Sequence, residues 1–336
     1  MPLNRRDLLA GAIGAGLIAP GPARAAGDGR TYRILMLTFR GETEVERGFR
    51  DYLAAAGIKV DIVSRDAARD MSKVQGFLKE VPALAPDLIY TWGTPVTLEV
   101  VGPYDAPDKS RYITDIPVVF ALVAAPVKAR IAPNFASSGR NVTGAVHVVP
   151  TDVQMRAMQS YRPFAKVGVL YSPSEPNSVA IVEEMRTQFK TSGVGLVERT
   201  FALNAAGQPT AAGVEDMVRD MRANGADWLY LLPDTFLGTI YKTVTPVALE
   251  AKLPTFGAAE LAVREGGALV GLVSRYYSVG QLAAQKAIDI LVDRRPPATV
   301  PIETLKRFSL IINMRVARAL GAYPPIAMLD YAEVIT

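Results

Sequence analysis

Cysteine and histidine, two residue types that often perform nucleophilic, acid–base or metal chemistry, are nearly absent from this chain. It has no cysteine and one histidine, His147, which falls within an apolar, strand-like stretch. No P-loop, G-x-S-x-G or G-x-G-x-x-G motif follows a strand-like segment, and metal-ligand spacing is missing. The sequence therefore predicts no catalytic centre, metal or cofactor, and it favours a structural or hinge role for His147.

Polar and aromatic residues instead gather where strand-like segments end. Phe39 and Arg40 follow the first such segment, and Trp92 follows a later one. Ligands of parallel α/β sheets bind beyond the carboxyl ends of the strands, so these positions are candidates for binding a small molecule. The full candidate set is Phe39, Arg40, Trp92, Thr94, Ala121, Ser174, Asn177, Ser178, Asp234, Arg275 and Tyr276.

Several of these residue types suit two roles. Ser174, Asn177 and Ser178 stand at the start of a predicted helix, where they suit an N-cap. They equally suit anion binding by hydroxyls and free backbone N–H groups at the positive end of that helix. Trp92 suits stacking on a flat ligand as well as burial in a core. The sequence leaves these alternatives open.

Alternating strands and helices must position these residues. Apolar runs without alternation predict buried strands, and apolar residues at helical spacing in 42–56 and 67–80 predict helices between them. Such a pattern indicates a parallel sheet that helices cover on both faces. The first five predicted strands are 33–38, 59–64, 87–91, 117–122 and 141–149.

The same alternation restarts at residue 166, which predicts a second doubly wound lobe and a boundary near 147–151. Its strands are expected at 166–171, 195–200, 227–232, 254–257 and 268–273, and its helices at 178–192, 210–224, 236–251 and 258–265. A long helix at 278–293, a strand at 302–311 and a helix at 315–320 complete the chain.

Length and composition agree with two globular lobes. A chain of 336 residues exceeds a typical single domain. Hydrophobic residues make up 49% and charged residues 21%, so each lobe has enough apolar side chains for a core. The net charge of +4 comes without a basic run, which argues against a nucleic-acid surface.

The first 25 residues have the organisation of an export signal. Arg5 and Arg6 precede an apolar run of about 12 residues, which is too short to span a bilayer. Ala23-Arg24-Ala25 has the small-x-small pattern of a cleavage site. The paired arginines suggest the twin-arginine (Tat) route, with a Sec signal as the alternative. We expect cleavage after Ala25 and a mature periplasmic protein that is not embedded in a membrane.

Several segments between residues 87 and 321 resemble those of a known family, and they occur in the same order along the chain. They are 87–95 (DLIYTWGTP), 116–121 (IPVVFA), 141–144 (NVTG), 167–178 (VGVLYSPSEPNS), Pro233-Asp234, Tyr276-Tyr277 with Gly280, and Ile312-Asn313 with Ala317 and 319–321. Together with the strand-like start near residue 31, they are similar to the ABC-transporter substrate-binding family that includes tryptophan- and tyrosine-binding lipoproteins.

The resemblance implies a type I periplasmic binding-protein fold, in which two Rossmann-like lobes hold a ligand between them. Three crossings would join the lobes, near 146–150, 273–277 and 304–309. Lobe 1 would comprise 31–147 and 276–305, and lobe 2 would comprise 148–275 and 306–336. Family ligands are small and often aromatic amino acids. The positions matching their contacts are Thr94, Ser174, Asn177, Ser178 and Asp234.

Two features depart from the family pattern. Arg275 stands before Tyr276, where the family usually has an acidic residue that suits a ligand ammonium group. Together with Arg40 it favours an anionic ligand group, which a guanidinium binds through two hydrogen bonds; exposure to solvent is the alternative reading. The absence of a cysteine for a lipid anchor favours a freely diffusing periplasmic protein.

These observations predict the solute-binding component of an ABC importer, without catalysis, which captures a small polar or aromatic metabolite that is amino-acid-like or a carboxylate. A membrane permease would be its partner, and ligand contact with both lobes would favour the closed form. The alternative is a ligand sensor that docks on a membrane kinase or receptor. A periplasmic enzyme is a third possibility. A DNA-bound regulator is excluded, because residues 1–30 contain a signal where a helix-turn-helix would stand.

Overall fold

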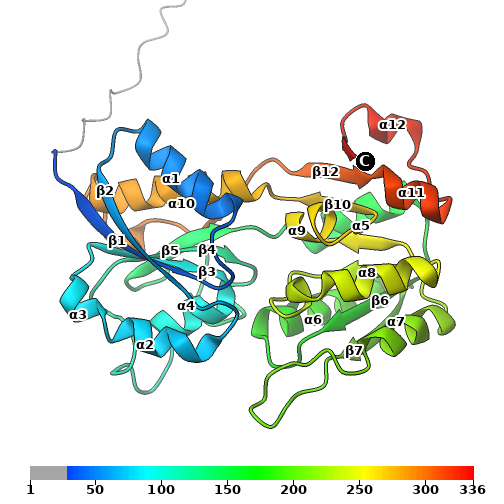
Figure 1. Cartoon of the computed structure of the whole chain (residues 1–336), viewed down its shortest axis with the longest axis horizontal. Coiled ribbons are helices and arrows are strands. Elements are labelled where there is room, and N and C mark those ends of the chain that lie inside the picture. The colour runs from blue at the N-terminus through cyan, green and yellow to red at the C-terminus, as the bar shows by residue number, and fades with distance from the viewer. Residues whose placement is uncertain (1–28) are drawn as a thin grey trace, which may run out of the picture.

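The computed structural model describes residues 29–336, so the predicted signal peptide and its cleavage site lie outside the described residues. Two sheets organise the chain (Figure 1). The first has six strands in the order β11-β5-β4-β3-β1-β2, and the second has seven in the order β13-β12-β10-β9-β8-β6-β7. All named strand pairs are parallel except β10 with β12. We call the part built on each sheet the first and the second lobe.

The first lobe contains most of the N-terminal half and two returning elements. Its elements are β1 (Tyr32–Thr38), α1 (Glu44–Ala55), β2 (Val60–Asp66), α2 (Val74–Leu78), α3 (Val81–Leu84), β3 (Leu88–Trp92), α4 (Gly93–Val101), β4 (Val118–Val123), β5 (Val142–Val146), α10 (Tyr276–Leu291) and β11 (Glu303–Thr304). The returning helix α10 packs against α1 and shares the apolar core of the first sheet.

The second lobe holds the middle of the chain and its C-terminus. Its elements are α5 (Thr151–Tyr161), β6 (Lys166–Tyr171), α6 (Pro176–Ser192), β7 (Gly195–Thr200), α7 (Val214–Ala223), β8 (Trp228–Leu231), α8 (Tyr241–Glu250), β9 (Thr255–Gly257), α9 (Glu260–Arg264), β10 (Val270–Val273), β12 (Ser309–Asn313), α11 (Met314–Leu320), α12 (Ile326–Leu329) and β13 (Glu333–Ile335). Two apolar clusters pack within this lobe.

The chain passes between the lobes three times, after β5, after β10 and between β11 and β12. The lobes therefore lie side by side and are joined along one edge (Figure 1). The prediction of two doubly wound lobes with three crossings is confirmed. The residue boundaries proposed for each lobe stay a prediction.

Some elements differ from those expected. The helix predicted over 67–80 does not begin at 67, because Ala68 and Arg69 adopt positive φ angles of 52° and 67°. A 3₁₀ turn at Met71–Lys73 and the short α2 replace most of it. Helices α4 and α5 were not predicted, and the strand expected over 302–311 is divided into β11 and β12 by the third crossing.

Both lobes repeat one strand order, which locates the site. From edge to centre the first sheet runs β2-β1-β3-β4-β5, and the second runs β7-β6-β8-β9-β10. The order reverses between β1 and β3 and between β6 and β8. At such switch points the chain leaves neighbouring strands toward opposite faces, which opens a crevice at their carboxyl ends. No helix within residues 29–336 is long and apolar enough to cross a bilayer.

Candidate functional site

A cavity with about 420 Å³ of empty space lies between the two switch points. The first lobe contributes Arg40 after β1, and Trp92 and Thr94 around the start of α4. The second lobe contributes Asn177 from the start of α6 and Asp234 after β8. Residues from both lobes therefore surround one space, and small-molecule sites commonly lie at such boundaries between domains.

Aromatic rings and a cation form the first-lobe wall. The rings of Phe39 and Trp92 are stacked with centroids 6.0 Å apart. The Arg40 guanidinium carbon lies 4.8 Å from the Trp92 ring centroid and 5.8 Å from that of Phe39. Arg40 also reaches the second lobe, where Nη1 donates to Gly238 O at 3.3 Å and Nη2 to Thr235 O at 3.5 Å.

The Asp234 carboxylate is a buried part of the second-lobe wall. It accepts hydrogen bonds from Ser172 N at 2.8 Å, Ser172 Oγ at 3.0 Å, Ser178 Oγ at 2.7 Å and Leu237 N at 2.8 Å. Four donors from three segments therefore occupy this carboxylate. Asp234 fixes the β6 and β8 loops relative to α6, and it offers a ligand charge more than free hydrogen-bonding capacity.

Glu175 lies beside Asp234 and is also buried. Its carboxyl accepts hydrogen bonds from Thr235 N at 2.8 Å and Thr235 Oγ1 at 2.5 Å. Burial, followed by repulsion from the Asp234 charge, raises the pKa of Glu175 to about 8. At neutral pH the protonated form of Glu175 therefore dominates.

His147 enters the cavity from the first crossing. It is 5% exposed, and its ring meets that of Tyr276 edge-on at a centroid distance of 6.1 Å. Burial lowers the pKa of His147 to about 4 despite a backbone hydrogen bond with Val123. The imidazole is therefore neutral at pH 7 and combines a place at the hinge with a place on the cavity wall.

Unpaired buried polar atoms concentrate at this cavity. Among residues 29–336, six buried side-chain polar atoms have no hydrogen-bond partner. Four of them belong to residues that line the cavity: Arg40 Nε, Trp92 Nε1, His147 Nδ1 and Asn177 Oδ1. Buried polar atoms are nearly always paired in folded proteins. A polar ligand between the lobes would give these atoms hydrogen-bond partners.

The predicted site residues separate into three groups. Arg40, Trp92, Thr94, Asn177, Asp234 and Tyr276 all line the cavity. Phe39 and Ser174 line a wider opening beside it. The remaining residues lie behind or away from the wall: Ser178 donates to Asp234, Ala121 is buried within β4, and Arg275 is bound elsewhere.

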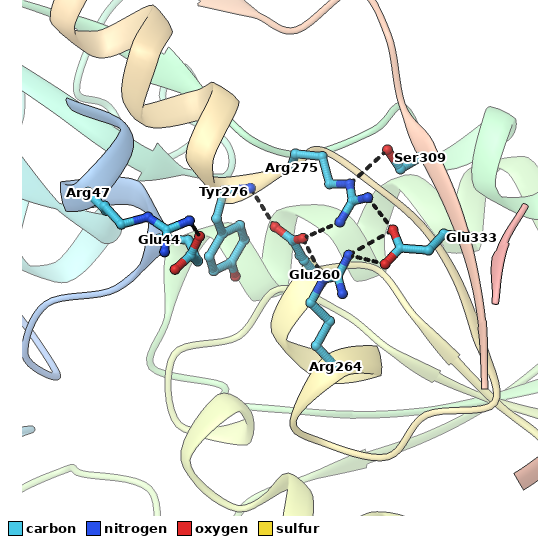
Figure 2. Close-up of polar contacts among 8 residues, drawn as sticks. All are labelled: Glu44, Arg47, Glu260, Arg264, Arg275, Tyr276, Ser309 and Glu333. Atoms are coloured by element: carbon cyan, nitrogen blue, oxygen red, sulfur yellow. Dashed lines mark hydrogen bonds and ion pairs between the residues drawn. The ribbon is translucent and has the colours of Figure 1, made fainter. Parts of the chain in front are cut away.

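Arg275 is engaged by carboxylates of the second lobe (Figure 2). Its Nη1 donates to Glu260 at 3.0 Å, its Nη2 pairs with Glu333, and its Nε donates to Ser309 at 3.1 Å. Arg264 joins the same two glutamates, each at 2.7 Å. Two glutamates therefore already match the charge of Arg275, and its role in binding a ligand anion stays a prediction.

Sequence reasoning missed part of the wall. Glu175 lies in the stretch that resembles the family but was not a candidate, and its raised pKa follows only from its burial next to Asp234. Leu122 also lines the cavity, with a φ of 58° where the register of β4 shifts between Ala121 and Val123. A bulky residue seldom adopts this conformation, and nothing in the local sequence signals it. No acidic or histidine cluster within 29–336 could hold a metal ion.

The model of the ABC transporter substrate binding protein family matches residues 36–335 of this chain. The chain belongs to this family. It is 27% identical over 276 residues to a tyrosine-binding protein of Clostridioides difficile, covering 82% of this chain and 73% of that protein.

Solved structures agree with this membership. An ABC domain in complex with L-Trp from Streptococcus pneumonia has a TM-score of 0.78 and 25% identity, over 91% of this chain and 100% of the other. A periplasmic ribose ABC transporter structure from Conexibacter woesei shares the fold, with a TM-score of 0.56 and 12% identity over 90% of this chain and 98% of the other. The substrate-binding protein thus has the type I periplasmic binding fold.

Proposed function

We propose that this chain is the periplasmic solute-binding component of an ABC importer and carries a small amino-acid-like or carboxylate ligand without chemical turnover. The observation that carries the proposal is the convergence of four unpaired buried polar atoms from both lobes on one cavity. A ligand that pairs with atoms of both lobes binds the closed form better than the open form, which couples capture to closure.

The chemistry of the two walls supports this ligand class. Arg40 Nε and Trp92 Nε1 are donors that suit a carboxylate. Asn177 Oδ1 is an acceptor beside the Glu175–Asp234 pair, which suits an ammonium group. A tyrosine-binding relative and an L-Trp complex within the family agree with a ligand that carries both groups.

Calorimetric titration of residues 26–336 with amino acids and small carboxylates tests the proposal. We expect at least one ligand to bind with a dissociation constant below about 1 mM. Asn177→Ala is expected to weaken it about tenfold or more, because a ligand donor loses its acceptor. Gln188→Ala, on the same helix but far along it, serves as the control. Absence of binding across the panel would contradict the proposal.

Export and transport have separate tests. The full chain expressed in a bacterium should appear in the periplasm with residue 26 as its N-terminus, and lysines at both Arg5 and Arg6 should block export by the twin-arginine route. Uptake of the ligand into vesicles that contain the permease and its ATPase should require the mature chain.

A further inference from the structure

Arg40 occupies the aromatic face that a flat ligand would use. Its guanidinium carbon is 4.8 Å from the Trp92 ring centroid, a distance typical of a cation–π contact. Phe39 stacks on Trp92 as well, so this aromatic pair is already in contact with a cation of the chain itself. A ligand ring could stack at the same place only after Arg40 had moved.

The charge of Arg40 is not matched by a carboxylate. Its two hydrogen bonds go to main-chain oxygens, at 3.3 and 3.5 Å, and Nε is buried with no partner. Among residues 29–336 it takes part in no ion pair. This contrasts with Arg275, which two glutamates hold.

The carboxylates of the cavity wall are engaged elsewhere. Asp234 has four donors, and Glu175 accepts two hydrogen bonds from Thr235. At a wider opening that Arg40 also lines, Glu42 pairs with Arg50 at 3.0 Å and Glu44 with Arg47 at 2.6 Å, whereas Glu265 is exposed to solvent. Glu260 is held by Arg264 and Arg275. A partly buried guanidinium without an anion therefore faces the cavity, and a ligand carboxylate is the group that would satisfy it.

We propose that Arg40 sets the specificity of this chain for a small aliphatic carboxylate and against aromatic amino acids. This inference rests on the proposed function and narrows its substrate class. The ligand carboxylate accepts from Arg40 Nε–H and a neighbouring N–H of the same guanidinium, while Trp92 Nε1–H supplies a further donor. Stacked on Trp92, the guanidinium forms the wall against which the aliphatic part of the ligand packs.

Titration of matched ligand pairs tests this assignment. The probes are L-leucine with L-leucinamide, butyrate with butyramide, and L-tryptophan with L-tyrosine. We expect an aliphatic carboxylate to bind the wild type about thirtyfold more tightly than its amide, as a charge-assisted pair predicts. Arg40→Gln should reduce this ratio to about threefold or less. Arg40→Ala should strengthen binding of the aromatic pair about fivefold, because the Trp92 face becomes free.

Arg315→Gln removes an exposed arginine on α11 and is the matched control, which should keep the wild-type ratios. Tighter binding of tryptophan or tyrosine than of every carboxylate by the wild type would overturn the inference while leaving the proposed function intact. A carboxylate-to-amide ratio that Arg40→Gln does not change would do the same. Failure of every probe to bind every variant would overturn both.

Discussion

At the scale of single residues, two buried groups that line the cavity have pKa values shifted in opposite directions. Burial lowers the pKa of His147 to about 4 and, with the charge of Asp234, raises that of Glu175 to about 8. Both shifts disfavour the charged form. Each group therefore makes the free energy of unfolding depend on pH, His147 in the acidic range and Glu175 in the range up to about pH 8.

Burial of His147 makes the folded protein less stable at acidic pH. Its folded pKa lies below the unfolded value, so its stabilising contribution is present above about pH 6.5 and is lost as the pH falls to 4. We expect His147→Gln to remove about 3 kcal/mol of the pH dependence of the unfolding free energy between pH 7 and 4. Urea denaturation at both pH values measures it. Equal pH dependence in variant and wild type would contradict the assignment.

Burial of Glu175 makes the folded protein less stable as the pH rises. Its folded pKa is raised, so stability is complete below the unfolded pKa and declines as the pH rises to about 8. Glu175→Gln keeps an oxygen to accept from Thr235 but carries no charge. Without ligand, we expect the variant to melt about 5 °C or more above the wild type at pH 9 and close to it at pH 5. A constant difference at both pH values would argue against a raised pKa.

At the scale of elements, α1 and α10 approach so closely that two glycines are required. A Cβ on Gly48 would lie 2.0 Å from Tyr277 O, and one on Gly280 would lie 1.9 Å from Val45 O. Backbone atoms leave no flexible end that could yield. The contact packs α10, from the C-terminal part of the chain, tightly against α1 near its start.

Gly280→Ala should therefore push the two helices apart. We expect a loss of about 2 kcal/mol or more in the free energy of unfolding, typical of overpacking against backbone. Gly76→Ala is the control, because Gly76 is exposed within α2 and its added Cβ meets nothing within 4 Å. There the better helix propensity of alanine should add about 0.5–1 kcal/mol. Guanidinium denaturation of both variants gives the comparison.

At the scale of the whole molecule, few side-chain hydrogen bonds join the two lobes away from the crossings. Away from them, the side-chain hydrogen bonds recorded between the lobes for residues 29–336 are those from Arg40 to Thr235 and Gly238, at 3.5 and 3.3 Å. Arg275, beside the second crossing, is tied to the second lobe by Glu260 and Glu333 (Figure 2). Motion between the lobes therefore has to bend the crossings.

We expect the lobes of the ligand-free protein to move apart in solution. The two hydrogen bonds from Arg40 to main-chain carbonyl oxygens are long, and such bonds contribute little to the stability of the closed form. Small-angle X-ray scattering should give a larger radius of gyration without ligand than with a saturating one. Asn177→Ala at the same ligand concentration should remain in the open form. A radius that is unchanged by a ligand of proven binding would show that capture does not require closure.

Much of the architecture follows from local sequence. The predicted strands of both lobes lie within a few residues of those observed, since buried parallel strands are continuous apolar runs. The rule that ligands bind beyond strand ends also located Arg40, Trp92 and Asp234 at the cavity. The broken helix at 67–80 escaped prediction, because positive φ angles at Ala68 and Arg69 have no signature in those residue types.

The sequence by itself determined the alternation of strands and helices along each lobe and its restart at residue 166, because buried parallel strands are continuous apolar runs. Only the tertiary structure decided which of two similar arginines carries a free charge. Arg40 and Arg275 both stand beyond strand ends, yet Arg275 meets Glu333, 58 residues away, and Arg40 meets no carboxylate among residues 29–336. Local patterns report secondary structure, whereas charge pairing, burial and pKa depend on neighbours that the fold brings from distant parts of the chain.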